Sequence, residues 1–372
     1  MQTNSGRRFY HPELDGLRFI AFLLVFIHNA NPILKGTFRE TFSAYSWFGV
    51  DLFFCLSAFL ITKLLMTEHG QTGKINIQNF YIRRILRIWP LYFFYIIVGT
   101  IIIAPMAGRN INIPGHLASL ATFTFNFAYL SLHFSPISIF IHLWSISHEE
   151  QFYAIIPWFL RKLSSLQEKT KWIVLLILFL AGSAIRAVLI YFKFPSLWIY
   201  FLPFTHFDSM LGGLAIGLGL LDKPLGKYQG RVLFAGILFI SMIFLLPNID
   251  VTRWGLMFTY PLVGYGMSLI VFSAIKKEHS FLGGALTNKT IVYLGKISYG
   301  LYVFHFSVFT LAVSLISKWV EVQQLPYPRY TFLVMLIGFL ITVIFSFASY
   351  NILEKPFLKL KERFGFISSR PI

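Results

Sequence analysis

Long apolar runs, rather than alternating or amphipathic spacings, dominate the hydrophobic pattern of this chain. Two examples are WIVLLILFLAGSAI at 172–185 and TFLVMLIGFLITVIFSFASY at 331–350. A helix needs about 20 such residues to cross the hydrocarbon core of a bilayer. The pattern therefore predicts an all-α fold, a polytopic transmembrane helical bundle of about ten spans. We expect these spans at residues 19–34, 46–66, 88–105, 144–160, 172–192, 199–221, 232–247, 254–275, 298–317 and 330–352.

The composition agrees with a single integral membrane domain over residues 1–372. The chain is 56% hydrophobic and only 13% charged, whereas about a quarter of the residues of a soluble domain are charged. The polar gaps are short, so we expect no separate soluble domain. Charged residues precede the first apolar run and no small-residue cleavage site follows it, which indicates a retained helix rather than a signal peptide. The single cysteine, Cys55, excludes an intrachain disulfide.

A net charge of +17 can indicate a nucleic-acid partner, but its distribution along this chain favours a membrane orientation instead. With the N-terminus inside, the expected cytoplasmic segments hold 24 of the 32 Lys and Arg residues, and the outer segments hold seven. An excess of positive charge on the cytoplasmic side sets the orientation of membrane proteins. We therefore expect both termini in the cytoplasm, a multi-pass protein of the cell (inner or plasma) membrane, surrounding lipids as partners, and no nucleic acid.

Residues 116–141 do not fit this scheme as a span. The stretch HLASLATFTFNFAYLSLHFSPISIFI is moderately apolar, but counting it as a span would invert every later segment. We predict a re-entrant or surface element on the outer side. Irregular backbone at membrane depth requires surrounding protein or a watered cavity, so we expect a cavity beside it. The chain has no internal repeat, and an inverted-repeat transporter gains no support.

Ionisable residues inside the predicted spans are candidates for function, because they are costly in a bilayer. His28 lies ten residues after Arg18, or about 15 Å along a helix, near the middle of the bilayer. An imidazole there can act as a general base on a hydroxyl, although a lone histidine on an apolar helix is often a satisfied core residue. Other ionisable residues of the spans include Asp51, Arg186, His206, Asp208 and His305. Internal pairing, such as Arg186 with Asp208, is the alternative for them.

Two further stretches gather polar side chains. In NFYIRRILRIWPLYFFY (79–95), Arg83, Arg84 and Arg87 share a helix surface near the inner boundary. Arginine forks suit phosphate oxygens, although a positive-inside anchor or a contact with anionic lipid is the more ordinary explanation for such a cluster on its own.

The second stretch is HLWSISHEEQFYAIIPWFL (142–160). Ser147 and Glu150 fit a capping box at a helix start. That pattern leaves Glu149, on the same face as Ser145 and Tyr153, as the candidate for a role in the cavity.

Five stretches and a closing motif together resemble the membrane-bound acyltransferase family 3, integral membrane O-acyltransferases that act on glycans. They are YHPELDGLRFIAFLLVFIH (10–28), WFGVDLFFCLSAFLIT (47–62), FYIRRILRIWPLY (80–92), LWSISHEEQFYAIIP (143–157), LGKISYGLYVFHF (294–306) and LEKPF (353–357). The chain departs from the family pattern at three places. Nine residues separate Arg18 from His28 where ten are more common, Ala58 replaces a glycine, and His148 stands where a small apolar residue is frequent.

The resemblance implies transfer of an acyl group, usually acetyl, from cytoplasmic acetyl-CoA or another acyl-CoA to a hydroxyl of an extracytoplasmic glycan. It implies no metal. Carried over by position, it makes His28, Glu149 and Asp51 catalytic candidates. The donor-binding candidates are Arg18, Arg83, Arg84 and Arg87, and the acceptor-binding candidates are Trp144, His148, Glu150, Tyr153 and His305.

The expected mechanism brings the thioester from the arginines to His28, which either accepts the acyl group or deprotonates the acceptor. The alternatives are a transporter or flippase of a glycan or metabolite, and a scaffold without catalysis. The acceptor stays open between lipopolysaccharide, exopolysaccharide, a nodulation-type oligosaccharide and a small metabolite. The acyl group, acetyl or succinyl, and the oligomeric state stay open as well.

Overall fold

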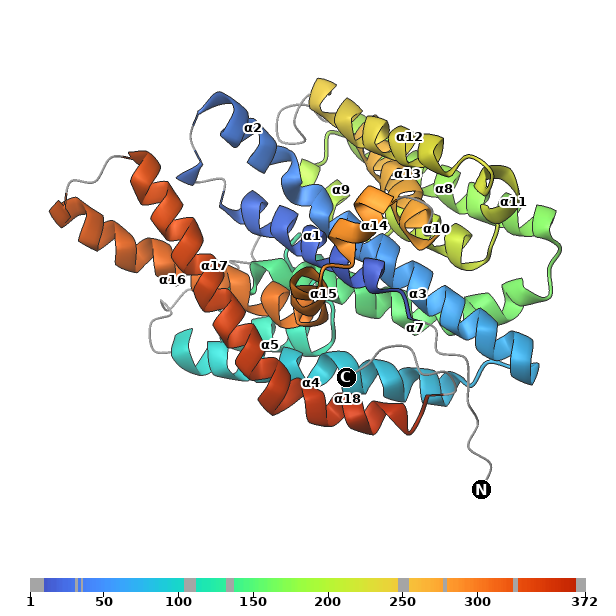
Figure 1. The fold of residues 1–372 in the computed structure, drawn as a ribbon, viewed down its shortest axis with the longest axis horizontal. Coiled ribbons are helices and arrows are strands. Elements are labelled where there is room, and N and C mark those ends of the chain that lie inside the picture. Colours follow the sequence, from blue (N-terminus) through green and yellow to red (C-terminus); the bar gives the residue numbers. More distant parts are fainter. Residues whose placement is uncertain are drawn as a thin grey trace.

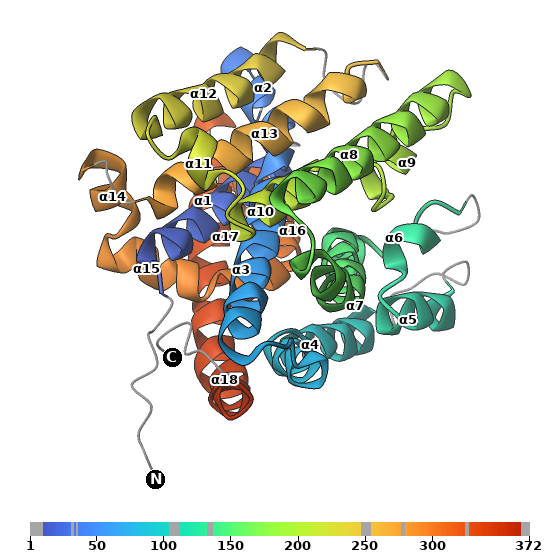
Figure 2. The same cartoon turned by 90° about the vertical axis from the view of Figure 1, so that its right-hand side faces the viewer.

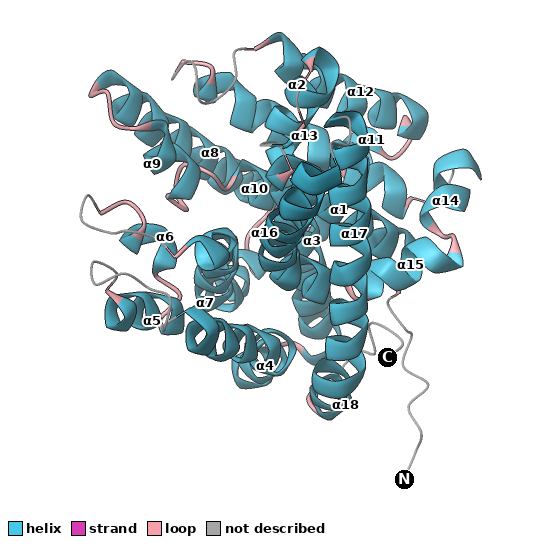
Figure 3. Cartoon of the chain, turned by 90° about the vertical axis from the view of Figure 1, so that its left-hand side faces the viewer, coloured by secondary structure: helices cyan, strands magenta, loops and turns pink. Residues whose placement is uncertain are grey.

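A computed structural model describes residues 10–30, 33–34, 36–103, 112–131, 137–246, 254–276, 280–323 and 327–365. Helices, turns and loops account for all of these residues and no strand occurs among them (Figure 3). The all-α prediction is confirmed.

The α-helices are α1 Pro12–Asn29, α2 Thr37–Tyr45, α3 Gly49–Thr72, α4 Ile77–Ile103, α5 Ile113–Ala121, α6 Phe125–Ala128, α7 Trp144–Ser164, α8 Glu168–Tyr191, α9 Ser196–Phe201, α10 Asp208–Gly217, α11 Asp222–Leu225, α12 Gln229–Met242, α13 Leu256–Ile275, α14 Ser280–Leu286, α15 Lys289–Lys296, α16 Ser298–Gln323, α17 Tyr327–Ser349 and α18 Lys355–Glu362. Short 3₁₀ segments cover Ser46–Phe48, Ser138–Leu143 and Ile243–Leu245, and a π-helical turn covers Tyr350–Glu354.

Six helical segments of the described chain are long and apolar enough to cross a membrane. They are Phe38–Thr72, Ile77–Ile102, Glu168–Tyr191, Leu256–Ile275, Ser298–Ser317 and Arg329–Glu362. They coincide with six of the ten predicted spans. Helices α1 and α7 form where two further spans are predicted, but they carry more polar residues, and α12 is shorter.

The prediction of one continuous span at 199–221 is wrong. The chain forms α9 and α10 there, separated by an irregular stretch that contains His206. Leu202 has extended backbone (φ −75°, ψ 129°). It precedes Pro203, and the proline ring disfavours helical backbone at the residue before it. The break allows the polar side chains of this stretch to face the protein interior.

Residues 116–141 are divided among short elements. Helices α5 and α6 and the 3₁₀ segment Ser138–Leu143 occupy the stretch, while 132–136 lie outside the described residues. No span-length helix occurs in its described part, in agreement with the prediction that it is not a full span. In Figure 2 the helices α5 and α6 lie beside α4 and α7 at one corner of the bundle.

Helices α1 and α3 run side by side through the middle of the fold, with the α16–α17 pair on one side and α8, α12 and α13 on the other (Figure 1). Gly213 and Gly217 bring α10 close to α3. A Cβ atom at Gly213 would overlap the carbonyl oxygen of Cys55, and one at Gly217 would lie 2.5 Å from Cβ of Thr62. This small-xxx-small spacing permits close helix contact. Ala58 faces Gly213, so the missing side chain of one helix makes room for the alanine of the other.

The start of α1 is fixed by a second close contact. A Cβ atom at Gly295 in α15 would overlap the backbone of Asp15, and one at Gly16 would overlap the carbonyl oxygen of Leu286. Helices α14 and α15 therefore pack directly against the backbone of α1. This packing sets the position of Arg18 one turn further along.

Arg186 and Asp208 form a buried ion pair between α8 and α10. Both terminal nitrogens of the Arg186 guanidinium, Nη1 and Nη2, contact the Asp208 carboxylate. Nη1 also donates to the Thr205 carbonyl and Nη2 to the Ser183 hydroxyl, each at 2.9 Å. Arg186 is fully buried. The predicted internal pairing of these two residues is confirmed, and it closes the irregular stretch before α10 onto α8.

We expect Gly213→Val to lower the thermal stability of the protein in lipid nanodiscs. The valine side chain would force α10 away from α3, and overpacking of this kind costs about 1–3 kcal/mol. Gly70→Ala is the matched control, because nothing lies within 4 Å of a Cβ at this exposed position of α3. Equal melting temperatures for Gly213→Val and the wild type would contradict the role given to this contact.

Asp208→Asn should destabilise the fold strongly, because it leaves the Arg186 charge buried without its partner. Loss of one member of a buried pair costs about 3–5 kcal/mol. Asp222→Asn is the control, since Asp222 pairs with Lys276 at 2.7 Å on a half-exposed surface, where a pair contributes about 1 kcal/mol or less. Similar shifts of the unfolding midpoint in the two variants would argue against a structural role for the buried pair.

Candidate active site

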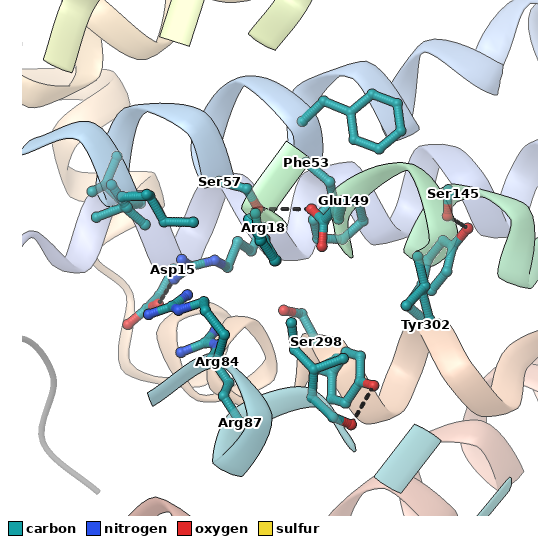
Figure 4. A pocket seen from close by; sticks show the side chains of 18 of the residues that line it. Asp15, Arg18, Phe53, Ser57, Arg84, Arg87, Ser145, Glu149, Ser298 and Tyr302 are labelled. Carbon is teal, nitrogen blue, oxygen red and sulfur yellow. Dashed lines mark hydrogen bonds and ion pairs between the residues drawn. The ribbon is translucent and has the colours of Figure 1, made fainter. Parts of the chain in front are cut away.

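A cavity between α1, α3, α4, α7 and α16 carries positive charge at one end, and we call it the arginine cavity. Four cationic side chains line it: Arg18, Arg84, Arg87 and Lys361. Figure 4 shows Arg18, Arg84 and Arg87 at one end, Ser145 and Tyr302 at the other, and Glu149 between them. Apolar side chains of α3, including Phe53 and Ile61, complete the wall. The cavity thus joins a cationic end to a partly apolar passage.

The arginines at the cationic end are held differently. Arg18 pairs with Asp15 at 2.9 Å, and Asp15 also accepts from the Tyr10 hydroxyl at 3.1 Å. Arg84 lies against the rings of Phe80 and Tyr153, both at 5.9 Å. These contacts hold the guanidinium groups of both arginines in place, which favours binding of an anion by preorganised donors.

Arg83 points away from this cavity. Its guanidinium contacts Glu68 at 3.3 Å and donates to the carbonyl of Phe364 at 2.8 Å. Within the described residues it is not part of the cavity wall. Arg83 therefore ties the α3–α4 hairpin to the segment that follows α18, while the other two arginines of the sequence cluster face the cavity.

The two adjacent glutamates of α7 have different surroundings. Glu149 lines the arginine cavity and accepts from the Ser57 hydroxyl at 2.7 Å (Figure 4). Glu150 lies 3.4 Å from Nε1 of Trp89. The predicted capping box is wrong. Helix α7 begins at Trp144, directly after a 3₁₀ segment, so Ser147 lies inside the helix and its hydroxyl is directed to the carbonyl of Leu143 at 3.4 Å.

A second cavity, which we call the histidine cavity, contains His28. The His28 ring presents Nδ1 to the carbonyl oxygen of Ser43 at 3.0 Å. A carbonyl can only accept, so Nδ1 carries the proton and Nε2 is the acceptor nitrogen of the neutral ring. Helix α2, which supplies Ser43, therefore selects the tautomer that a general base requires.

The two cavities meet at Val50 and Tyr302, which line both of them. The Tyr302 hydroxyl donates to the carbonyl of His142 at 2.9 Å and bonds to the hydroxyl of Ser145. Arg18 and His28 belong to one helix but line different cavities, because ten residues of helix separate them by about 15 Å. Helix α1 thus connects the cationic end of the arginine cavity to the imidazole of His28.

Asp51 lies behind the wall of the histidine cavity rather than in it. It accepts from Nε2 of His206 at 3.1 Å and from the Ser209 hydroxyl at 2.7 Å. Nδ1 of His206 faces the carbonyl of Tyr200 at 2.9 Å. Both ring nitrogens therefore face acceptor oxygens. The rings of Trp144 and Tyr200 pack on His206, so this pair supports the cavity wall.

Of the remaining residues predicted to bind the acceptor, two line a cavity and two are buried in the protein interior. Trp144 lines the histidine cavity and Tyr153 the arginine cavity. His305 is buried beside them, with Nδ1 bonded to the carbonyl of Tyr302 and Nε2 accepting from Asn29 at 3.0 Å. His148 is buried among the rings of Phe54, Trp144 and His206. Neither His148 nor His305 belongs to the described lining of the two cavities.

Several lining residues were not predicted as site residues from sequence. Tyr302 falls inside the quoted stretch 294–306, and a polar residue in an apolar helix was a usable signal there. Trp47 and Tyr260 of the histidine cavity gave no signal in an aromatic-rich chain, and neither did Lys361 in a basic C-terminal helix. Among the described residues, no group of three or more His, Cys, Asp or Glu side chains is arranged to hold a metal ion.

The chain is similar to curated O-acetyltransferases. "Putative O-acetyltransferase SAS0844" of Staphylococcus aureus is 27% identical over 96% of this chain and 59% of its own length. "O-acetyltransferase OatA" of S. aureus is 27% identical over 94% and 57%. "Putative peptidoglycan O-acetyltransferase YrhL" of Bacillus subtilis is 26% identical over 93% and 55%. The chain thus spans less than two thirds of the length of these relatives.

No solved structure matches the chain. A family model described as an acyltransferase domain matches residues 11–351, which is most of its length. That range contains α1, the described lining of the histidine cavity, and the lining of the arginine cavity except Tyr10 and Lys361. The chain belongs to the acyltransferase 3 family.

Proposed function

We propose that the protein transfers an acetyl group from cytoplasmic acetyl-CoA to a hydroxyl of a cell-surface glycan. The observation that carries this proposal is the meeting of two chemically different cavities at Val50 and Tyr302. One cavity suits a phosphate-bearing donor and the other holds an imidazole with a defined tautomer. Membership of an acyltransferase family and similarity to proteins named O-acetyltransferases support the same reaction.

The donor binds in the arginine cavity in this proposal. Arg18, Arg84, Arg87 and Lys361 contact the phosphates of coenzyme A, because guanidinium groups bind phosphate oxygens in a bidentate manner. The pantetheine arm extends along the apolar wall, and Glu149 accepts a hydrogen bond from one of its amide groups. The thioester then lies near Tyr302, at the entrance to the histidine cavity.

His28 carries the chemistry at the junction. Its Nε2 removes the proton of the acceptor hydroxyl, and the hydroxyl oxygen attacks the thioester carbonyl carbon. The carbon–sulfur bond then breaks, and the thiolate leaves and takes the proton back from His28. General-base assistance of this kind contributes about 10²–10⁴-fold to a rate. Transient acylation of His28 is the alternative route.

The proposal includes an orientation. About ten crossings, with the broken α9–α10 segment counted as one of them, and both termini in the cytoplasm place the arginine cavity at the inner face and the histidine cavity toward the outer face of the cell membrane. The positive-inside distribution of Lys and Arg supports this orientation. Coenzyme A is then reached from the cytoplasm and the glycan from outside.

The acceptor is a glycan of the cell surface. The relative YrhL is named for peptidoglycan, which makes peptidoglycan the first acceptor to test, before lipopolysaccharide and exopolysaccharide. Release of free thiol from acetyl-CoA, measured with each glycan on the purified chain in nanodiscs, tests the reaction. Glycan movement across the membrane without thioester consumption would instead identify a transporter.

Arg87→Gln should raise the KM for acetyl-CoA about tenfold, because one charge-assisted contact to phosphate contributes about 1.5–3 kcal/mol. Arg83→Gln is the matched control. Arg83 itself is bonded to Glu68 and Phe364 outside the cavity, so this variant should change stability more than donor KM. Equal increases in donor KM would remove the distinction between these arginines.

His28→Ala should lower kcat for thiol release by at least 100-fold while leaving the KM for acetyl-CoA within about threefold. Its imidazole lies in the other cavity from the arginines. His69→Ala, at the far end of α3, controls for loss of a histidine. A His28 variant that changes donor KM instead of kcat would contradict the proposed division of labour.

A further inference from the structure

Three side chains of the histidine cavity carry a buried polar atom that no described residue satisfies. They are Nε1 of Trp47, Nδ1 of His142 and the hydroxyl of Tyr260. Each residue is at least 95% buried. A buried polar group without a partner costs about 1–3 kcal/mol, and most such groups in proteins are paired. Their occurrence in one cavity wall indicates a ligand that supplies the missing partners.

The three atoms have complementary hydrogen-bonding capacity. The indole Nε1 of Trp47 can only donate. Nε2 of His142 faces the carbonyl of Val303 at 3.0 Å and carries the ring proton, so Nδ1 can only accept. The Tyr260 hydroxyl can do both. A group that both donates and accepts at several neighbouring positions matches this set, and sugar hydroxyls have that property.

Aromatic rings supply the rest of the wall. Trp144 and Tyr200 lie with their ring centroids 4.7 Å apart, and both line the cavity. The face of an aromatic ring is electronegative and attracts the slightly positive C–H groups of a neighbour. A pyranose presents C–H groups on its faces and hydroxyls at its edge, so it fits between ring faces and the polar atoms.

The histidine cavity also differs from the arginine cavity in charge. No Asp, Glu, Lys or Arg is among its described lining residues, and one nitrogen of both His28 and His142 is bonded to a backbone carbonyl. A carboxylate brought into such a site would lose its water without gaining a cationic partner, which is costly. The cavity therefore favours an uncharged ligand.

We propose that the histidine cavity binds an uncharged glycosyl residue of the acceptor, with Trp47, His142 and Tyr260 as its hydroxyl-binding groups. The inference rests on the proposed function and narrows its acceptor to glycans with a neutral sugar at the acylated position. Sugars with a free carboxylate, such as uronic acids and N-acetylmuramic acid without a peptide on its carboxyl group, are excluded from that position.

The test measures sugar binding without donor, by saturation-transfer NMR on the full chain in nanodiscs. The probes are methyl glycosides of glucose, galactose, mannose and N-acetylglucosamine, each paired with its acidic counterpart: the three uronic acids and N-acetylmuramic acid. At least one neutral sugar should bind, and more than tenfold better than its acidic counterpart. Stronger binding of the acidic member, or binding of none of the neutral sugars, overturns the inference.

Tyr260→Phe gives the sharper variant. It removes only the unpartnered hydroxyl, so the ligand-free protein should keep or raise its melting temperature while neutral-sugar affinity falls about three- to tenfold, the size of one hydrogen bond. Tyr95→Phe is the matched control, since its hydroxyl is bonded to the carbonyl of Ile139 and to Ser307. That variant should lose stability and keep its sugar affinity.

The two proposals fail separately. A lower melting temperature with unchanged sugar affinity in Tyr260→Phe would make its hydroxyl structural and overturn the inference, whatever the enzyme activity. Selective binding of a neutral sugar without any thiol release from acetyl-CoA would support the site and overturn acyl transfer. Trp47→Phe and His142→Asn repeat the measurement at the other two atoms, and His142→Asn should lose less affinity than His142→Phe, because its amide retains an acceptor.

Discussion

A polar side chain withdrawn from water needs a partner, and this requirement organises the interior of the bundle. Arg186 finds Asp208, and Asp51 finds His206 and Ser209. These contacts join α8 to α10 and the start of α3 to the break before α10. The interior polar groups therefore first stabilise the contacts between helices that otherwise pack through apolar side chains. Only after these pairs are assigned can the remaining polar groups be considered for function.

The same requirement separates supporting residues from candidates for the reaction. His305 has both ring nitrogens bonded, to Tyr302 and Asn29, and its hydrogen bonds orient the helix that carries Tyr302. His28 has its Nδ1 fixed by a carbonyl and lines a cavity. Both are histidines in apolar helices, so residue type and position do not distinguish them. Their hydrogen-bond partners distinguish them. The same comparison singles out His142, because its Nδ1 has no partner among the described residues.

Sequence patterns predicted what depends on local chemistry. Apolar length gave the six long helices, and opposite charge in adjacent segments gave the Arg186–Asp208 pair. Pro203 also indicates a helix break, but the continuous hydropathy of 199–221 favoured an unbroken span. The division of the site into two cavities could not be predicted from the sequence. It depends on contacts between residues far apart in the chain, such as that of Tyr302 with the carbonyl of His142, 160 residues away. Periodicity carries no information on such pairs.

The division into two cavities changes the meaning of the Arg18–His28 spacing. If the two side chains acted at one point, removing one residue between them would rotate one relative to the other by about 100° and separate them. They line different cavities, so the helix acts as a spacer, and one residue alters the distance by only about 1.5 Å. Each side chain is oriented by its own contacts: Asp15 and the α14–α15 packing orient Arg18, and the Ser43 carbonyl orients His28. A spacer of this kind tolerates the nine-residue interval.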